Sequence, residues 1–206
     1  MRLAWCAAAM LLTASIASAQ HTPISRLNKV LDAPTRTAVL AIIDSARVEG
    51  LPAEVLVNKA LEGAGKQAAG PRIVAAVHKL AGELRSSRDA LGPASRDAEI
   101  TAGAHAIHAG VTQAELTRLR RAGVGRLLTT PLMVLTDLVA RGVPPATAST
   151  AVVSLERAGL RDADFTAYQR SVRQDIDRGA DPAAATTTRA RGAELRRGGA
   201  PPTRGP

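Results

Sequence analysis

Two histidines are spaced so that they could share a metal ion. His105 and His108 lie three residues apart in a segment expected to be helical. A closed metal site needs more ligands, and the sequence offers no other nearby histidine, cysteine or carboxylate cluster. His108 also lies in the last turn of the expected helix, where a cation meets the negative end of the helix dipole. We therefore expect no metal or other cofactor, and a structural role for His108.

A glycine-containing stretch is similar to a phosphate-binding loop but lacks two of its parts. Residues 62–70 read EGAGKQAAG. The motif needs a glycine five residues before Gly65-Lys66 and a serine or threonine after the lysine, where this chain has Ala60 and Gln67. We interpret the stretch as a turn before Pro71.

No catalytic motif is complete. The sequence contains no Gly-x-Ser-x-Gly elbow, His-Glu-x-x-His helix or dinucleotide fingerprint. Carboxylate pairs such as Asp162/Asp164 suit helix starts and surfaces better than acid–base catalysis, which needs a shared pocket. We expect a protein that is not an enzyme. The alternative, an enzyme of unrecognised type, would need a pocket that gathers residues such as His105, His108 and Glu115.

One stretch resembles the opening of a DNA-binding helix-turn-helix. In GVTQAELTRLRRAGVGR (110–126) the spacing before Ala122-Gly123-Val124 is too long, and Thr130-Pro131 follows too soon for a recognition helix. Aromatic residues, on which nucleic-acid bases stack, make up only 1% of the chain. We expect no nucleic-acid partner.

Residues 178–206 hold six arginines against Asp181 and Glu194, so they contribute +4 of the formal net charge of +9. Residues 178–206 are rich in Gly, Pro, Thr and Arg, and Leu195 is their only large apolar residue, so we expect a disordered tail. The tail could bind anionic lipid headgroups or lipopolysaccharide; an unselected GC-rich composition would also explain it. The candidate anion-binding residues are Arg178, Arg189, Arg191, Arg196, Arg197 and Arg204.

Four stretches share the pattern of a tight turn between helices. A glycine after a helix accepts the left-handed conformation that closes the helix, and the next, aliphatic residue can fold back on the last turn. Pro52 and Pro144 suit the start of the following helix, and Thr112 with Glu115 forms a capping box. We call these turns seams: Glu49-Gly50-Leu51-Pro52, Ala109-Gly110-Val111-Thr112, Arg141-Gly142-Val143-Pro144 and Ala158-Gly159-Leu160-Arg161.

Apolar residues between the seams recur with helical spacing. Ile73, Val74, Val77, Leu80, Ala81 and Leu84 form one stripe, with Arg72, Lys79 and Glu83 opposite. A second stripe, Phe165, Tyr168, Val172 and Ile176, follows Asp162, the expected N-cap.

The periodicity predicts an all-α fold, an irregular array of short antiparallel helical hairpins over residues 20–177 with a disordered C-terminal tail over 178–206. The expected helices are Thr22–Leu31, Thr35–Glu49, Pro52–Glu62, Pro71–Arg88, Ser95–Ala109, Gln113–Ala122, Pro131–Arg141 and Pro144–Ala158, with a ninth over Ala163–Asp177.

The first nineteen residues have the order of a secretory signal peptide. Arg2 precedes an apolar run from Leu3 to Leu12, and small residues lead to an Ala-x-Ala site before Gln20. The run is shorter than the roughly 20 apolar residues of a membrane-spanning helix. Cleavage would remove Cys6, the only cysteine. We expect an exported protein, in the periplasm or outside the cell, with no transmembrane segment after cleavage.

Two longer runs carry a family resemblance. Residues 50–84 and 131–155 resemble segments of uncharacterised, signal-peptide-bearing, Ala/Arg-rich bacterial proteins, over most of residues 35–178. The resemblance implies an exported helical protein and carries over no site residues. Helix arrays expose continuous grooves to which partners can bind. The sequence therefore favours a non-catalytic envelope protein that acts as an interaction or scaffold module. We expect its partner to be another envelope protein.

Overall fold

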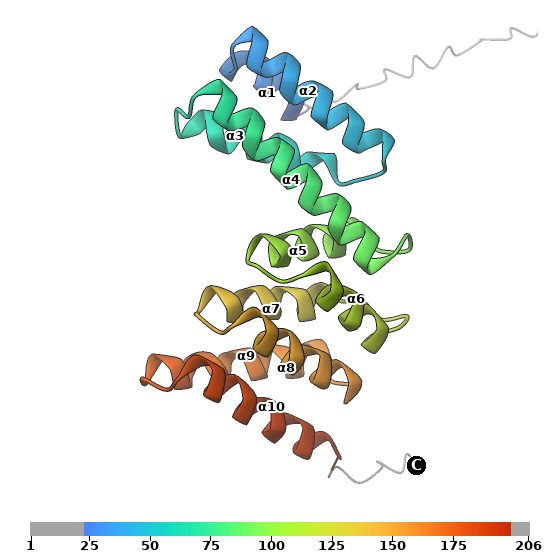
Figure 1. Cartoon of the computed structure of the whole chain (residues 1–206), viewed down its shortest axis with the longest axis vertical. Helices are drawn as coiled ribbons and strands as arrows, with labels where there is room; N and C mark the ends of the chain where they lie inside the picture. Colours follow the sequence, from blue (N-terminus) through green and yellow to red (C-terminus); the bar gives the residue numbers. More distant parts are fainter. Residues whose placement is uncertain (1–22, 199–206) are drawn as a thin grey trace, which may run out of the picture.

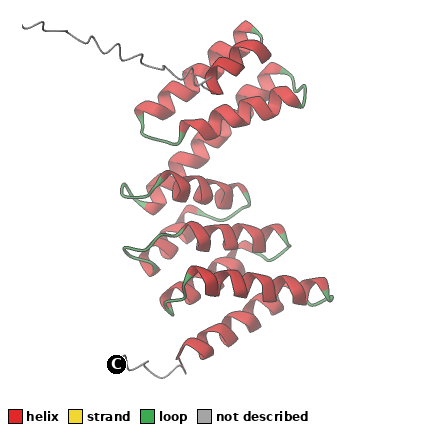
Figure 2. Cartoon of the chain, turned by 180° about the vertical axis from the view of Figure 1, so that it is seen from behind, coloured by secondary structure: helices red, strands yellow, loops and turns green. Residues whose placement is uncertain are grey.

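The computed structural model describes residues 23–198, and these fold into helices joined by short loops, without a strand in that range (Figures 1 and 2). The prediction of an all-α array of helical hairpins is confirmed. The described helices are α1 (Pro23–Val30), α2 (Ala33–Val48), α3 (Ala53–Gly65), α4 (Gly70–Leu91), α5 (Asp97–His108), α6 (Gln113–Ala122), α7 (Thr129–Ala140), α8 (Pro145–Arg157), α9 (Asp162–Asp177) and α10 (Pro182–Gly198).

The four predicted seams have the expected backbone conformation. Gly50, Gly110, Gly142 and Gly159 all have positive φ, from 67° to 104°. The aliphatic residue after each glycine donates its N–H to a carbonyl of the preceding helix, as in the bond from Leu51 to Ala46 at 2.8 Å, and its side chain is buried. This is the hydrogen bond of a Schellman motif. The seams therefore set the ends of α2, α5, α7 and α8.

Helix starts differ more from the predictions. Thr112 and Glu115 form the expected capping box, with the Thr112 N–H donating to Oε2 of Glu115 at 2.8 Å. Asp162, expected as an N-cap, is instead the first residue of α9; the Asp164 carboxylate accepts from the N–H of Arg161. The carboxylate that caps the helix is thus one turn inside it, which the position of Asp162 alone did not reveal.

The helices stack in two layers (Figure 1). In the even layer α2, α4, α6, α8 and α10 follow one another in contact. In the odd layer α1 packs on α3, and α5, α7 and α9 form a second run. Each described helix therefore packs on the helix two positions further along the chain. The exception among the described helices is the pair α3 and α5, which do not pack on each other in this way. The odd layer is therefore interrupted between α3 and α5.

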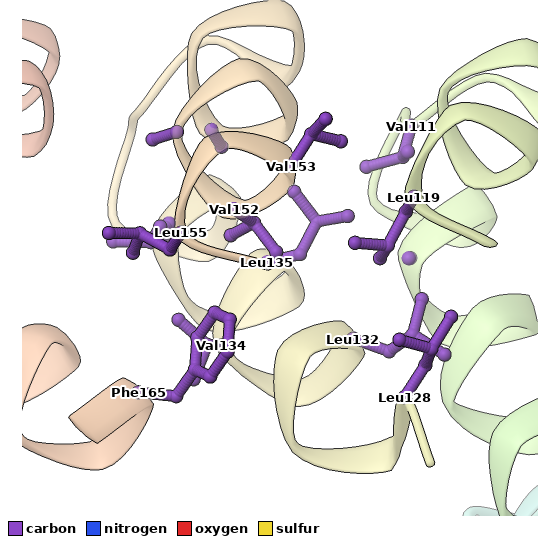
Figure 3. Close-up of a cluster of buried hydrophobic side chains, with 14 of the residues drawn as sticks. Val111, Leu119, Leu128, Leu132, Val134, Leu135, Val152, Val153, Leu155 and Phe165 are labelled. Carbon is purple, nitrogen blue, oxygen red and sulfur yellow. The ribbon is translucent and has the colours of Figure 1, made fainter. Parts of the chain in front are cut away.

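Two clusters of buried apolar side chains meet at α4 and α5. One cluster holds α1–α3 and the first part of α4 together with Ile100 and Ala104. The other runs from Ala90 and Leu91 at the end of α4 through to α10, and Figure 3 shows its centre around Leu135 and Phe165. Because α4 contributes to both clusters, this helix holds the two parts of the stack together at the place where α3 and α5 separate.

Close helix contacts depend on glycine. A Cβ on Gly103 of α5 would lie 2.2 Å from Oγ of Ser87 on α4, and a Cβ on Gly70 would lie 2.0 Å from Oγ1 of Thr35 on α2. Both distances are well inside van der Waals contact, so α4 can approach α5 and α2 this closely only because these side chains are absent.

Residues 182–198 correct the predicted tail. They form α10, which packs on α8 and α9. Ala185, Thr186, Ala190 and Ala193 are buried, so small side chains supply this contact. We expected disorder because the segment has only one large apolar residue. In the structure, close packing of small side chains instead offsets the conformational entropy that is lost when the helix forms. The remainder of the predicted tail, 199–206, lies outside the described residues.

A fifth seam, which was not predicted from the sequence, precedes α10. Gly179 has a φ of 95°, and the N–H of Ala180 donates to the carbonyl of Asp175 at 3.0 Å. Asp181 then caps α10 by accepting from the N–H of Ala184 at 2.8 Å. The stretch Gly179-Ala180-Asp181-Pro182 thus repeats the helix–glycine–start pattern with alanine in the aliphatic position.

The predicted signal peptide, residues 1–19, lies outside the described residues. Within 23–198, none of the helices is both long and apolar enough to cross a bilayer.

Candidate binding groove

A groove opens where the odd layer is interrupted. It has a volume of about 930 Å³ and runs from α3 across α5 to α7; we call it the α3–α5–α7 groove. Such a volume is in the range of pockets that hold small ligands or several side chains of a peptide. Its lining consists of Leu51, Pro52, Ala53, Glu54, Val55, Asn58, Asp97, Ala98, Thr101, Ala102, His105, Thr129, Met133, Thr136, Asp137 and Ala140.

Helical spacing places one stripe of α5 along the groove. Asp97, Thr101 and His105 are four residues apart and therefore project from one face. The opposite side of α5 is buried, with Ile100 and Gly103 packed into the stack. Because of the helical period, the apolar residues of α5 face the core, and the polar residues Asp97, Thr101 and His105 face the groove.

Met133 is the most exposed large apolar side chain of the groove. It is 61% exposed, although its neighbours Leu132 and Val134 on α7 are buried. With the small side chains of Ala98 and Ala140, it gives the groove an apolar surface that water covers in the free protein. Burying that surface under a ligand would be favourable.

The charges of the groove are opposite to those of the whole chain. Within the described range, no lysine or arginine lines the groove, although the chain has 27 of them. Glu54 and Asp97 are exposed and form no ion pair with a described residue. Asp137 is already neutralised by Arg141, whose Nε lies 2.9 Å from Oδ2. Two carboxylates are therefore free to meet a ligand.

The pKa of Asp137 reflects its pairing. Burial raises the pKa of this carboxyl, but the hydrogen bond and positive charge of Arg141 outweigh burial and hold the pKa below its usual value. Asp137 is thus ionised, and its charge is paired with Arg141. It therefore belongs to the wall of the groove and is not available to bind a ligand.

A smaller pocket of about 410 Å³ adjoins the groove and contains both candidate metal ligands. Val55, Asn58 and His105 line both hollows, and His108 lines the smaller one. Nδ1 of His108 lies 2.9 Å from Oε1 of Glu83. Glu83, predicted on the wet face of α4, is only 8% exposed. Glu83 lies at the edge of the apolar stripe of α4, where His108 of α5 packs against it.

The structure separates the residues of the enzyme alternative. His105 and His108 share a pocket, but Glu115 lies outside it, held in the capping box of α6. In residues 23–198 no three histidine, aspartate or glutamate side chains are grouped as a metal site would need. His108 occupies the last turn of α5, as predicted.

A buried polar network lies on the closed side of α5. Glu99 accepts from the N–H of Leu128 at 2.9 Å and from Arg120, and Arg120 also donates to the carbonyl of Arg126 at 2.9 Å. Arg126 in turn donates a hydrogen bond to the carbonyl of Leu160. The network fixes the loop between α6 and α7 against α5 and α8.

Two glutamates of this region have opposite pKa shifts. Burial raises the pKa of Glu99, but its hydrogen bonds from Leu128, Arg96 and Arg120 outweigh burial and lower the pKa overall. Burial also raises the pKa of Glu156, and Arg126 compensates only in part. Nη1 of Arg126 is 2.8 Å from Oε1 of Glu156, yet neither carboxylate oxygen receives an aligned hydrogen bond from a described residue.

The candidate anion-binding arginines are in several different environments. Arg189 forms a bidentate pair with Asp175, at 2.6 and 2.7 Å, and Arg178 lies 3.6 Å from the same carboxylate. Arg191, Arg196 and Arg197 are exposed on α10 and make no ion pair with a described residue. Arg204 lies outside the described residues. Three of the six are therefore unpaired cations on the last turns of α10.

The groove was not predicted from the sequence, although three of its lining residues, Leu51, Pro52 and His105, were singled out there for other roles. One signal was present: Met133 is out of phase with the Leu132, Leu135 and Leu138 stripe, which marks it as an apolar residue on a wet face. Glu54 and Asp97 carried no such signal, because acidic residues are common in the first turn of a helix.

Comparison of the chain with protein-family models, with curated protein sequences and with solved structures gave no match. The resemblance to exported Ala/Arg-rich helical proteins therefore stays a prediction.

Proposed function

We propose that this is an exported, non-catalytic envelope protein whose helical stack docks a segment of another envelope protein in the α3–α5–α7 groove. The observation that carries the proposal is the interruption of the odd layer, which leaves an apolar surface around Met133 uncovered between α3, α5 and α7. Helical arrays commonly bind partners in such grooves.

The construction of the stack supports this assignment. Gly103 brings α4 and α5 together, and the Glu99–Arg120 pair holds the same, closed side of α5. The wall of the groove is therefore held from behind. A preformed wall lowers the entropy cost of binding, because little needs to become ordered when the partner arrives.

Site-specific photo-crosslinking in living cells tests the docking site. A crosslinking amino acid at Met133 is expected to capture one partner protein. The same amino acid at Ala114, an exposed position on α6, serves as the control. If both positions capture the same set of proteins, or if only Ala114 captures one, the groove is not the docking site.

Export is tested by the N-terminus of the protein recovered from the cell envelope or the medium. The proposal expects a mature chain that begins at Gln20. A chain recovered from the cytoplasm with its first residues intact would contradict export.

A second candidate function is association with an anionic surface, lipid or lipopolysaccharide, through the end of α10. Leu195 is 77% exposed, and Arg191 lies four residues before it on the same helix face. Arg196 and Arg197 follow directly. An exposed apolar side chain among unpaired arginines is the arrangement by which helices bind anionic interfaces, at about 1 kcal/mol per basic residue.

Vesicle sedimentation tests this candidate. The change of Arg191, Arg196 and Arg197 to Gln is expected to weaken binding to anionic vesicles by at least about tenfold. The matched control changes three exposed arginines elsewhere, Arg121, Arg157 and Arg170, to Gln. Binding that survives high salt unchanged, or that falls equally in both variants, would contradict a role for α10.

A further inference from the structure

We propose that the occupant of the α3–α5–α7 groove is a cationic amphipathic segment, which presents both apolar side chains and lysine or arginine to the groove. This inference rests on the proposed docking function and specifies the chemistry of the docked segment. It follows from the charge and the apolar surface of the groove taken together.

Charge complementarity gives the sign of the occupant. Glu54 lies on α3 and Asp97 on α5, two of the three helices that line the groove, and both carboxylates are exposed and unpaired among the described residues. A segment that contacts both helices would therefore meet a carboxylate from each of them. An acidic segment would instead place like charges together, which costs free energy at an interface.

The remaining surface of the protein strengthens this selectivity. The formal net charge is +9, so the molecule as a whole repels a cationic segment at long range, whereas the groove attracts it. The absence of lysine and arginine from the described groove lining is therefore a local reversal of the overall charge. Attraction at one place and repulsion elsewhere would direct a basic segment to the groove.

The positions of Glu54 and Asp97 at the starts of their helices explain only part of the chemistry of the groove. Acidic residues in the first turn stabilise a helix through its dipole, and both Glu54 and Asp97 occupy that position. A dipole role does not explain why Met133 on a third helix is 61% exposed in the same hollow. The apolar surface needs an apolar partner, and the carboxylates need a basic one, so a segment with both properties fits.

The apolar part of the groove favours a segment with aliphatic side chains. Met133, Val55 and Leu51 provide the larger contacts, and Ala98 and Ala140 leave room between them. Methionine adapts its shape to different partners, which suits a groove that accepts a segment rather than one rigid ligand.

Fluorescence anisotropy with a defined probe tests the inference. The probe is a labelled Leu/Lys peptide of about 14 residues, or about four helical turns, and its counterpart replaces each Lys by Glu. The full chain is expected to bind the Leu/Lys peptide at least about tenfold more tightly than the Leu/Glu peptide. The double variant E54Q/D97N is expected to lose about fivefold to tenfold in affinity, more at low salt than at high salt.

A matched variant separates location from overall charge. D89N/D162N removes two exposed carboxylates outside the groove, and Asp162 is, like Asp97, the first residue of its helix. Its affinity for the Leu/Lys peptide is expected to stay within about twofold of the unchanged protein. Equal losses in E54Q/D97N and D89N/D162N would overturn the inference. Circular dichroism of both variants establishes that they are folded.

A blocking variant distinguishes failure of this inference from failure of the docking function. Thr101→Trp places a large ring in the groove and is expected to abolish both peptide binding and crosslinking to the cellular partner. If Thr101→Trp abolishes crosslinking while the Leu/Lys and Leu/Glu peptides bind equally, the groove docks a partner of other chemistry, and this inference is wrong. If Thr101→Trp changes nothing, the docking function is wrong as well.

Discussion

The two sides of α5 differ in how closely a neighbouring helix approaches. Toward α4, Gly103 lies against Ser87 with no room for a methyl group. Toward α3, Asp97, Thr101 and His105 face an open groove. Small residues close one side, and polar residues leave the other uncovered. The stack is therefore not uniformly packed, and the groove lies where one expected helix contact is missing.

The sharpest test of this difference uses two residues of α7. Leu135 is fully buried, whereas Met133 faces the groove. Leu135→Ala is expected to lower the free energy of unfolding by about 3 kcal/mol, because it leaves a cavity in the core. Met133→Ala is expected to change it by less than about 0.5 kcal/mol. Denaturant titration measures both, and a large loss in Met133→Ala would mean that the groove is part of the core.

The close contact between α4 and α5 gives the next largest effect. Gly103→Ala is expected to lower the free energy of unfolding by about 2 kcal/mol, because the new Cβ collides with Ser87. Gly82→Ala on α4 is the control: its Cβ meets no atom within 4 Å, and it should gain about 0.5–1 kcal/mol from helix propensity. Thermal unfolding of both variants checks this, and equal effects would show that α4 and α5 are not tightly packed.

The network behind α5 predicts opposite pH dependence for two buried glutamates. The pKa of Glu99 is lowered from 4.5, so its stabilising contribution is present above 4.5 and is lost as the pH falls through the folded-state pKa. Glu99→Gln should cost about 1–2 kcal/mol at neutral pH, with the loss shrinking in acid.

For Glu156 the sign is reversed. Its pKa is raised above 4.5, so the folded state binds the proton more tightly, and stability is lost as the pH rises through the folded-state pKa. Glu156→Gln should therefore stabilise the protein at neutral pH and have little effect below 4.5. Unfolding curves across acidic and neutral pH measure both variants, and parallel curves for the two would contradict the assigned shifts.

The smallest effect concerns the turn after α3, a helix that also lines the groove; here the N–H of Ala68 donates to the carbonyl of Gly63 at 3.0 Å, as in the seams. Gln67 has a φ of 54° and occupies the position that glycine takes in the seams. Gln67→Gly is expected to stabilise the protein by about 1 kcal/mol, because the left-handed conformation is strained for a residue with a Cβ. Gly50→Gln makes the reverse change, at a φ of 67°, and should cost a similar amount in thermal unfolding. A destabilised Gln67→Gly would mean that the Gln67 side chain is needed there.

Local signals predicted most of the helices. The seam glycines and the Thr112–Glu115 box act within a few residues, so sequence spacing alone locates them. The helix α10 was missed because its stability depends on distant partners: Tyr168 donates to the carbonyl of Thr186, and Arg189 pairs with Asp175. Its alanines carry no strong periodic signal before those neighbours are known.

The groove could not be predicted for the same physical reason. It exists because α3 and α5 do not stack, and contacts between helices far apart in sequence are not encoded in the spacing of either one. His105 and His108 were identified as neighbours on one helix, but the approach of Glu83, 25 residues earlier, depends on how α4 crosses α5.

The most direct test of the docking groove is the methyl NMR signal of Met133. The chain has three methionines, Met1, Met10 and Met133, so the Met133 signal is assigned by its loss in Met133→Leu. The crosslinked partner, added to the full chain with isotope-labelled methionine methyl groups, is expected to shift or broaden this signal until one equivalent is bound. A partner that binds while the Met133 signal stays unchanged would contradict docking in the α3–α5–α7 groove.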